Sequence, residues 1–193
     1  SKGEYYCMRT ELDKIIANIK PLCKTAMEEA KKHQSRLAKP PGSLGKLEDI
    51  SVQLAGITGK VHNSIEKKHL LVFAADNGVV AEGVASAPQS VTLKQAINLT
   101  KEKTGASVLA AHFGCGITVC DVGINADVKN SDVIDKKIAY GTNNIAKGSA
   151  MTKEQAIKAI ITGAGLAKST DADIIGVGEM GIGNTTTASA VLS

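Results

Sequence analysis

The segment from Gly176 to Thr187 carries the residue types best suited to holding an anionic ligand. It reads GVGEMGIGNTTT and follows an apolar run. Glycines allow a tight turn and let a ligand approach main-chain N–H groups. A helix that starts after the turn adds unpaired N–H donors and a partial positive charge, and the Asn and Thr side chains add further donors. The composition therefore predicts a cradle for a phosphate or a carboxylate.

Three ligand classes fit the glycine spacing of this segment. Gly176, Gly178 and Gly181 spell G-x-G-x-x-G, the dinucleotide fingerprint, which needs an acidic residue about 20 positions later that the sequence does not reach. Gly178 and Gly183 have the spacing of a nucleotide-hydrolysing P-loop, but Asn184 stands where that loop needs Lys. A cradle for a single phosphate requires neither feature. The glycines could also serve only close packing of a helix on a strand, and spacing leaves these interpretations open.

Weaker signals come from two other polar positions. Asp76 follows an apolar run and is followed by Asn77-Gly78, so it could orient a ligand hydroxyl or simply cap the turn. Gln89 follows Pro88 and could place an amide in a pocket or open the next helix. The histidines stand at no spacing typical of a metal site or a catalytic triad, and we interpret all four as structural: His33, His62, His69 and His112.

The elements that must position these residues alternate between apolar runs and helical periodicity. Helical patterns cover residues 10–36 with a break at Pro21, then 44–57, 89–111, 152–168 and 184–193. Thr152 and Gln155 form a capping-box pattern at the start of the fourth of these. Buried strands are predicted at 70–75, 117–122 and 173–177, with a short strand at 137–140 and a glycine-rich turn from Gly178 to Thr185.

Strands that alternate with helices predict an α/β fold with a mostly parallel sheet flanked by helices. In such sheets, ligands bind beyond the carboxyl ends of the strands, where the three polar or glycine-rich turns are expected. The change of character near His69 predicts an N-terminal helical segment over residues 1–60 and an α/β domain over 61–193.

The composition narrows the classes of molecule that could bind this protein. Aromatic residues make up 3% of the 193 residues and Trp is missing, whereas proteins that stack nucleic-acid bases are usually richer in aromatic side chains. The net charge of +4 is spread without long basic runs, which favours a small anionic ligand over nucleic acid. The four cysteines show no zinc-site spacing. The sequence has neither a signal-peptide pattern nor an apolar run of membrane-spanning length, so we predict a cytoplasmic protein without membrane partners.

Four segments together resemble one enzyme family. They are RLAKPPGSLGKLE at 36–48, ADNGV at 75–79, Pro88-Gln89, and GEMGIGNTT at 178–186. In order and separation they are similar to nicotinate-nucleotide–dimethylbenzimidazole phosphoribosyltransferases, and the resemblance runs from about Thr10 to Ser193. It implies a Rossmann-like sheet with a small helical domain, usually in a homodimer. The implied reaction moves ribose 5-phosphate from nicotinate mononucleotide to 5,6-dimethylbenzimidazole, which gives α-ribazole 5′-phosphate and nicotinate for cobalamin synthesis.

The resemblance also implies roles for individual residues and needs no metal or cofactor, because the leaving nicotinate is already a good leaving group. Glu179 would lie at the reaction site, where it would orient substrate or stabilise developing charge. Gly181, Ile182, Gly183, Asn184 and Thr185 would hold the 5′-phosphate, and the neighbouring Gly178 and Met180 are also implied in substrate binding. Ala81, Ser86 and Gln89 would line the benzimidazole pocket, with Asp76 at its edge.

One departure from the family is expected to matter. Family members are much longer, and the glutamate taken as their general base lies in their C-terminal part. We therefore expect the sheet to be incomplete in this chain and the base to be missing from it, so that the chain forms a homodimer or associates with the missing part. The alternatives are a non-catalytic module that binds nucleotide or benzimidazole and, more distantly, a fragment of a dinucleotide-dependent oxidoreductase.

Overall fold

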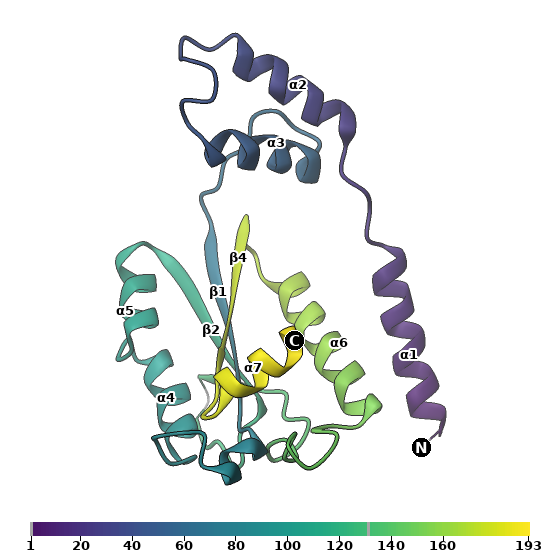
Figure 1. Ribbon diagram of the computed structural model, residues 1–193, viewed down its shortest axis with the longest axis vertical. Coiled ribbons are helices and arrows are strands. Elements are labelled where there is room, and N and C mark those ends of the chain that lie inside the picture. Colours follow the sequence, from purple (N-terminus) through teal and green to yellow (C-terminus); the bar gives the residue numbers. More distant parts are fainter. Residues whose placement is uncertain (1, 131) are drawn as a thin grey trace. The chain divides into compact units, whose positions relative to one another are not determined.

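The computed structural model describes residues 2–130 and 132–193 (Figure 1). They fall into two compact units, one of Lys14–Ile65 and one that joins Ser1–Asp13 to Glu66–Ser193. The first helix, α1 (Lys2–Ala17), begins earlier than the predicted helical pattern and ends before Pro21. None of the described helices is long and apolar enough to cross a membrane.

The helical unit is built on α2 (Lys24–Ser35) and α3 (Lys46–Thr58), as the periodicity predicted. Their contact is made by small residues, with Ala26, Ala30, Val52 and Ala55 buried together. The connector between the helices is fixed by an ion pair of 2.7 Å between Lys39 Nζ and Glu48 Oε1. That lysine lowers the pKa of the Glu48 carboxyl, and the N–H of Leu44 adds to the effect. The segment at 36–48, one of the four that carry the family resemblance, thus forms the connection of one helical hairpin.

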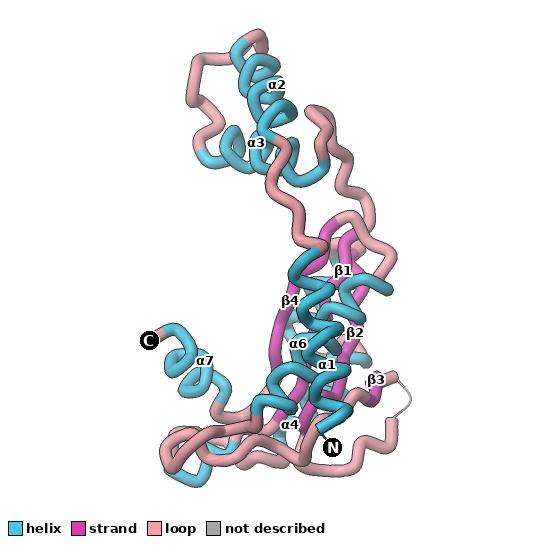
Figure 2. The backbone as a smooth tube through the Cα atoms, turned by 90° about the vertical axis from the view of Figure 1, so that its right-hand side faces the viewer, coloured by secondary structure: helices cyan, strands magenta, loops and turns pink. Residues whose placement is uncertain are grey.

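The α/β unit holds a four-stranded sheet of β1 (Lys68–Ala75), β2 (Cys115–Gly123), β3 (Val133–Asp135) and β4 (Ile174–Met180). The strand order is β3-β2-β1-β4 and every pair is parallel, which confirms the predicted α/β class. The helices are α4 (Val91–Thr100), α5 (Gly105–His112), α6 (Lys153–Ser169) and α7 (Asn184–Leu192). Figure 1 shows α4 and α5 on one side of the sheet and α6 on the other, and Figure 2 turns this unit by 90°.

The core under the α4 side is aliphatic, as expected from the scarcity of aromatic residues. It contains Val72, Ala74, Ala96, Leu99, Val119, Ile124 and Val133. α6 begins at the predicted capping box, with Gln155 N donating to Thr152 Oγ1 at 3.2 Å.

Three predicted element boundaries were wrong. The helix expected over 89–111 is two helices, because α4 ends at Thr100 and Thr104 caps the start of α5, accepting from Ser107 N at 3.2 Å. The short strand lies at Val133–Asp135 instead of 137–140, where the Lys137 side chain is held by other contacts. β4 runs on to Met180, so the turn starts at Gly181 and not at Gly178.

The strand order defines where a ligand should bind. From β1 the chain moves outward to β2 and β3, and it then crosses back to form β4 on the other side of β1. Ligands of open parallel sheets bind at such a reversal, beyond the carboxyl ends of the two strands that flank it. In this chain these are the ends of β1 and β4.

Candidate functional site

The end of β4 is pressed against the end of β1, with Ala74 paired to Met180 in the parallel register. A Cβ on Gly181 would lie 2.0 Å from the carbonyl oxygen of Ala75 and 2.9 Å from Asn77 Nδ2. Gly183 has a φ of 84°, a conformation that side chains disfavour, and forms the N-cap of α7. The turn between β4 and α7 therefore requires glycine at both positions.

Two buried polar side chains hold this turn in place. Asn77 Nδ2 donates to the Ile182 carbonyl at 3.2 Å, and Asn77 Oδ1 accepts from Thr187 Oγ1 at 2.9 Å. Thr92, which is fully buried in α4, accepts from the Ile182 N–H at 3.1 Å. The residue after Asp76 thus joins the ends of β1, β4 and α7, a role that the sequence analysis did not predict.

The residues predicted to act in this segment divide into two groups. Gly181, Ile182, Gly183, Asn184 and Thr185 form the turn and the first turn of α7. The N–H groups of Ile182 and Thr185 already donate within the chain, to Thr92 Oγ1 and to Asn184 Oδ1 at 2.8 Å. The bond from Thr185 is local and its residue is exposed, so an anion can replace it more easily than the buried bond to Thr92.

The other predicted residues of the segment lie in β4. Gly178 is a strand residue, and a Cβ added to it would lie 3.7 Å from Val72 Cγ2. Met180 packs against the aliphatic core. Glu179 is exposed and its carboxylate accepts a short hydrogen bond from Asn184 Nδ2. The structure thus brings Glu179 to the edge of the turn and turns Met180 away from it.

The dinucleotide interpretation is wrong in this structure. Gly176 and Gly178 belong to β4, so the first two glycines of the fingerprint form no turn. A Cβ on Gly176 would lie 3.2 Å from Leu70 Cδ1, which shows that this glycine makes room for a side chain of β1. For Gly176, the interpretation that the glycine serves close packing therefore holds.

Asp76 and Gln89 lie together, whereas two other predicted residues do not join them. Both line a cavity of about 190 Å³ with Ser90, Leu93, Ile124, Asn125 and Ala126. Gln89 Nε2 also donates to the Asn77 carbonyl at 3.4 Å. Ala81, in the short 3-10 helix Gly78–Glu82, and Ser86, in the loop after it, are exposed and do not line this cavity.

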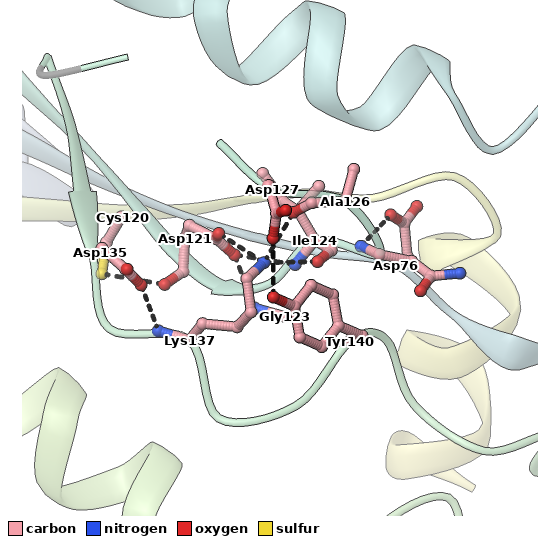
Figure 3. A network of polar contacts seen from close by, with 11 residues as sticks. Asp76, Cys120, Asp121, Gly123, Ile124, Ala126, Asp127, Asp135, Lys137 and Tyr140 are labelled. Carbon is pink, nitrogen blue, oxygen red and sulfur yellow. Dashed lines mark hydrogen bonds and ion pairs between the residues drawn. The ribbon is translucent and has the colours of Figure 1, made fainter. Parts of the chain in front are cut away.

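A second polar cluster, which the sequence analysis missed, lies beside this cavity (Figure 3). Asp121 at the end of β2 is 1% exposed and pairs with Lys137, Nζ to Oδ2 at 2.7 Å. The Lys137 ammonium also stands 4.7 Å from the centre of the Tyr140 ring. Burial raises the pKa of the neighbouring Cys120 thiol to about 11. The only sequence signal was an aspartate near the end of a buried strand, because a lone lysine in a loop belongs to no motif.

Among residues 2–130 and 132–193, no group of three or more His, Cys, Asp or Glu side chains could hold a metal ion. The turn can hold an anion at the N-terminus of α7, and the cavity beside Asp76 is lined by both apolar and polar side chains.

Comparison with known proteins gives consistent matches. The family model described as "Phosphoribosyltransferase" matches residues 19–193. The chain is 47% identical over 185 residues to a nicotinate-nucleotide–dimethylbenzimidazole phosphoribosyltransferase of Clostridium tetani, and 50% identical over 184 residues to that of Clostridium perfringens, each covering 94% of the chain. A crystal structure of such an enzyme from Thermus thermophilus is 36% identical, with a TM-score of 0.82 over 86% of this chain and 52% of that one. The chain spans about half the length of these relatives.

Proposed function

The chain belongs to the nicotinate-nucleotide–dimethylbenzimidazole phosphoribosyltransferase family, and on this premise we propose that it binds nicotinate mononucleotide for transfer of its ribose 5-phosphate to 5,6-dimethylbenzimidazole. The observation that carries the proposal is the glycine turn of Gly181–Asn184, which lies at the strand reversal and opens α7. A helix N-terminus at that place in a parallel sheet favours a phosphate.

The proposed phosphate site consists of the turn from Gly181 to Thr185. The phosphate would take the hydrogen bond that Thr185 N now gives to Asn184 Oδ1. Released from that bond, the Asn184 side chain can turn its amide to the phosphate or keep its contact with Glu179. Gly178 and Met180 would act indirectly, by letting β4 lie close to β1 and by anchoring it to the core.

Glu179 is proposed to face the sugar and the departing ring. In nicotinate mononucleotide the ring nitrogen is a pyridinium, and positive charge moves toward the anomeric carbon as the C–N bond breaks. The exposed Glu179 carboxylate beside the phosphate turn would stabilise the positive charge that develops at the anomeric carbon. The acceptor nitrogen then bonds to the anomeric carbon as nicotinate leaves, and inversion gives the α product.

The acceptor is proposed to lie near Asp76 and Gln89, whose cavity has an apolar wall suited to a flat ring. The exposed positions of Ala81 and Ser86 would reach it only from the rim. The N–H proton of the acceptor must be removed, and we place the general base in the part of the relatives that this chain does not span. β4 supports packing of further chain or of a second copy, since it ends the described sheet and Val177 on it is 76% exposed. A homodimer and a cytoplasmic location remain proposals.

The proposal is tested by calorimetric titration of the 193-residue chain with nicotinate mononucleotide, followed by chromatographic assay of nicotinate and α-ribazole 5′-phosphate. We expect one bound mononucleotide per chain, and turnover about 10² to 10⁴ times below that of the Clostridium tetani enzyme, as for loss of a general base. Thr185→Pro, which removes the exchangeable N–H at the second residue of α7, should weaken binding, with folding checked by circular dichroism.

Each result has a clear meaning. Failure to bind the mononucleotide would contradict the proposed function. Binding together with normal turnover would place the base within this chain. Binding with no turnover under any condition, even with the remaining part of a relative added in trans, would favour a non-catalytic binding module.

A further inference from the structure

Asp76 is a buried carboxylate with one oxygen left without a partner. The residue is 3% exposed, and its Oδ2 accepts from the Asn125 N–H at 2.8 Å. Its own main chain is fully engaged, because its N–H donates to Gly123 O at 2.9 Å and its carbonyl accepts from Thr142 N at 3.0 Å. Within the described ranges no group donates to Asp76 Oδ1. An unpaired buried oxygen is costly, and native proteins that keep one usually have a use for it.

The loop that holds Asp76 is itself fixed by Lys137 and Asp121 (Figure 3). Lys137 Nζ donates to the carbonyls of Ile124 at 2.5 Å and of Ala126 at 3.1 Å, the two residues on either side of Asn125. Asp121 Oδ1 accepts from the N–H groups of Gly123 at 3.0 Å and of Ile124 at 2.8 Å. The loop whose Asn125 N–H donates to Asp76 is thus held by both members of the Lys137–Asp121 ion pair.

This loop also forms a wall of the cavity that Asp76 lines. Ile124, Asn125 and Ala126 line it together with Gln89 and Leu93. In Figure 3 one oxygen of Asp76 is turned to the loop and the other is turned away from it. The ion pair therefore fixes the loop segment that lines the cavity and that donates to the paired oxygen of Asp76.

We propose that Asp76 Oδ1 accepts a hydrogen bond from a substrate hydroxyl or N–H in this cavity, and that Lys137 and Asp121 are the positioning residues that aim it. The proposal rests on the proposed function and adds which atom recognises the substrate. Two substrates carry a suitable donor: the ribose hydroxyls of nicotinate mononucleotide and the ring N–H of the benzimidazole. A carboxylate gives a stronger bond to such a donor than a neutral acceptor does.

Asp76→Asn separates a ligand role from a structural one. The amide oxygen can still accept from Asn125, and the amide N–H₂ then stands where the free oxygen was. If Asp76 only supports the fold, losing an unpaired buried charge should leave stability equal or higher. If it recognises a ligand, the substituted atom donates where acceptance is needed, and affinity falls while stability does not.

The experiment titrates the 193-residue chain with nicotinate mononucleotide and, separately, with 5,6-dimethylbenzimidazole. The variants are Asp76→Asn, Lys137→Met, Lys137→Arg and the double Asp76→Asn/Lys137→Met, each checked by urea denaturation. Lys67→Met is the matched control, since Lys67 forms an exposed ion pair of 2.6 Å with Asp171. We expect Asp76→Asn to weaken one ligand at least tenfold, Lys137→Met to weaken the same ligand, and Lys137→Arg to recover most of the loss. The double variant should be no weaker than the worse single one, because both changes act through one oxygen.

The outcomes are distinguishable. Weakening of the mononucleotide alone assigns the ribose hydroxyls as the donor, and weakening of the benzimidazole alone assigns the ring N–H. Unchanged affinity of Asp76→Asn for both ligands, with equal or higher stability, overturns the assignment and leaves a proton or a water as the partner of Oδ1. The positioning role is overturned if the affinity losses of the two single variants add in the double variant. It is also overturned if Lys137→Arg folds but binds the ligand as weakly as Lys137→Met. If the unaltered chain binds neither ligand, the proposed function fails and this assignment fails with it.

Discussion

A buried aspartate lies at the carboxyl end of both β1 and β2, Asp76 directly after β1 and Asp121 near the end of β2, and the two side chains have different partners. Asp121 has an ion pair on one oxygen and two main-chain donors on the other. Asp76 has one main-chain donor on one oxygen and no described donor on the other. The first is a closed arrangement that fixes a loop. The second leaves one buried oxygen unpaired in a residue that lines a cavity.

The difference shows that burial of a carboxylate does not by itself indicate a site. Both residues lie at the carboxyl end of an apolar strand and both are nearly inaccessible. What separates them is that the chain places a charged partner against Asp121 Oδ2 and none of the described groups against Asp76 Oδ1. A carboxylate with a partner at each oxygen is explained by the fold, whereas one with an unpaired oxygen points to a partner that the chain does not supply.

The largest expected effect is on stability at the end of β2. Asp121→Asn should lower the free energy of unfolding by about 3–5 kcal/mol, because it leaves the Lys137 ammonium in a buried place without its counter-charge. Urea denaturation measures the change. Asp171→Asn, in the exposed pair with Lys67, is the control and should not shift the midpoint measurably. Equal stability losses in Asp121→Asn and Asp76→Asn would remove the contrast between the two aspartates.

A smaller loss of stability is expected from steric crowding at the end of β1. Gly181→Ala puts a Cβ into the Ala75 carbonyl and should cost about 1–3 kcal/mol together with most of the affinity for nicotinate mononucleotide. Gly165→Ala, inside α6 with open space around it, is the matched control and should stabilise the chain by about 0.5–1 kcal/mol. Thermal unfolding and calorimetry check both. Unchanged affinity in Gly181→Ala would exclude the turn as the phosphate site.

A third prediction uses Cys120 to report on the closed end of β2. Because burial raises the pKa of this thiol to about 11, it is almost entirely neutral at pH 8 and should resist iodoacetamide, whereas the exposed Cys7 and Cys23 react. Mass spectrometry after timed alkylation gives the rate at each site. In Asp121→Asn, Cys120 should be modified faster, since local opening becomes easier. An unchanged rate would mean that the ion pair does not hold this strand end closed.

The smallest effect is expected at the rim of the same cluster. Tyr140 donates its hydroxyl to Asp127 Oδ1 at 2.7 Å, and this bond raises the pKa of the Tyr140 phenol. A raised pKa means that the contribution of the bond is complete below the ordinary tyrosine pKa near 10 and is lost as pH rises through the folded value. Absorbance titration at alkaline pH should therefore show a late-ionising tyrosine that Tyr140→Phe removes. At pH 7, where the bond is intact, that variant should unfold at a slightly lower urea midpoint, because the bond is exposed and contributes little.

Much of the scaffold could be predicted from the sequence because its signals are local. Continuous apolar runs located β1, β2 and β4, and Thr152 with Gln155 located the start of α6. The extent of β4 was missed because glycines suggest a turn, and only the Leu70 side chain of β1 explains why Gly176 lies in a strand. Lys137 was missed for a related reason. Its partners are main-chain carbonyls and a distant aspartate, and no spacing along the chain records them.

The pairing of β1 with β4 also sets an order of events in folding. Asp173 Oδ2 accepts from the N–H of Lys67, 106 residues away, so this edge closes only after a very long loop has been brought together. Closure of long loops is entropically unfavourable, and contacts of this separation slow folding and tend to form late. The turn that follows β4 should therefore be assembled at the end of the process. A bound mononucleotide would act on contacts that the folding transition state lacks, and would prolong the lifetime of the native state more than it would accelerate folding.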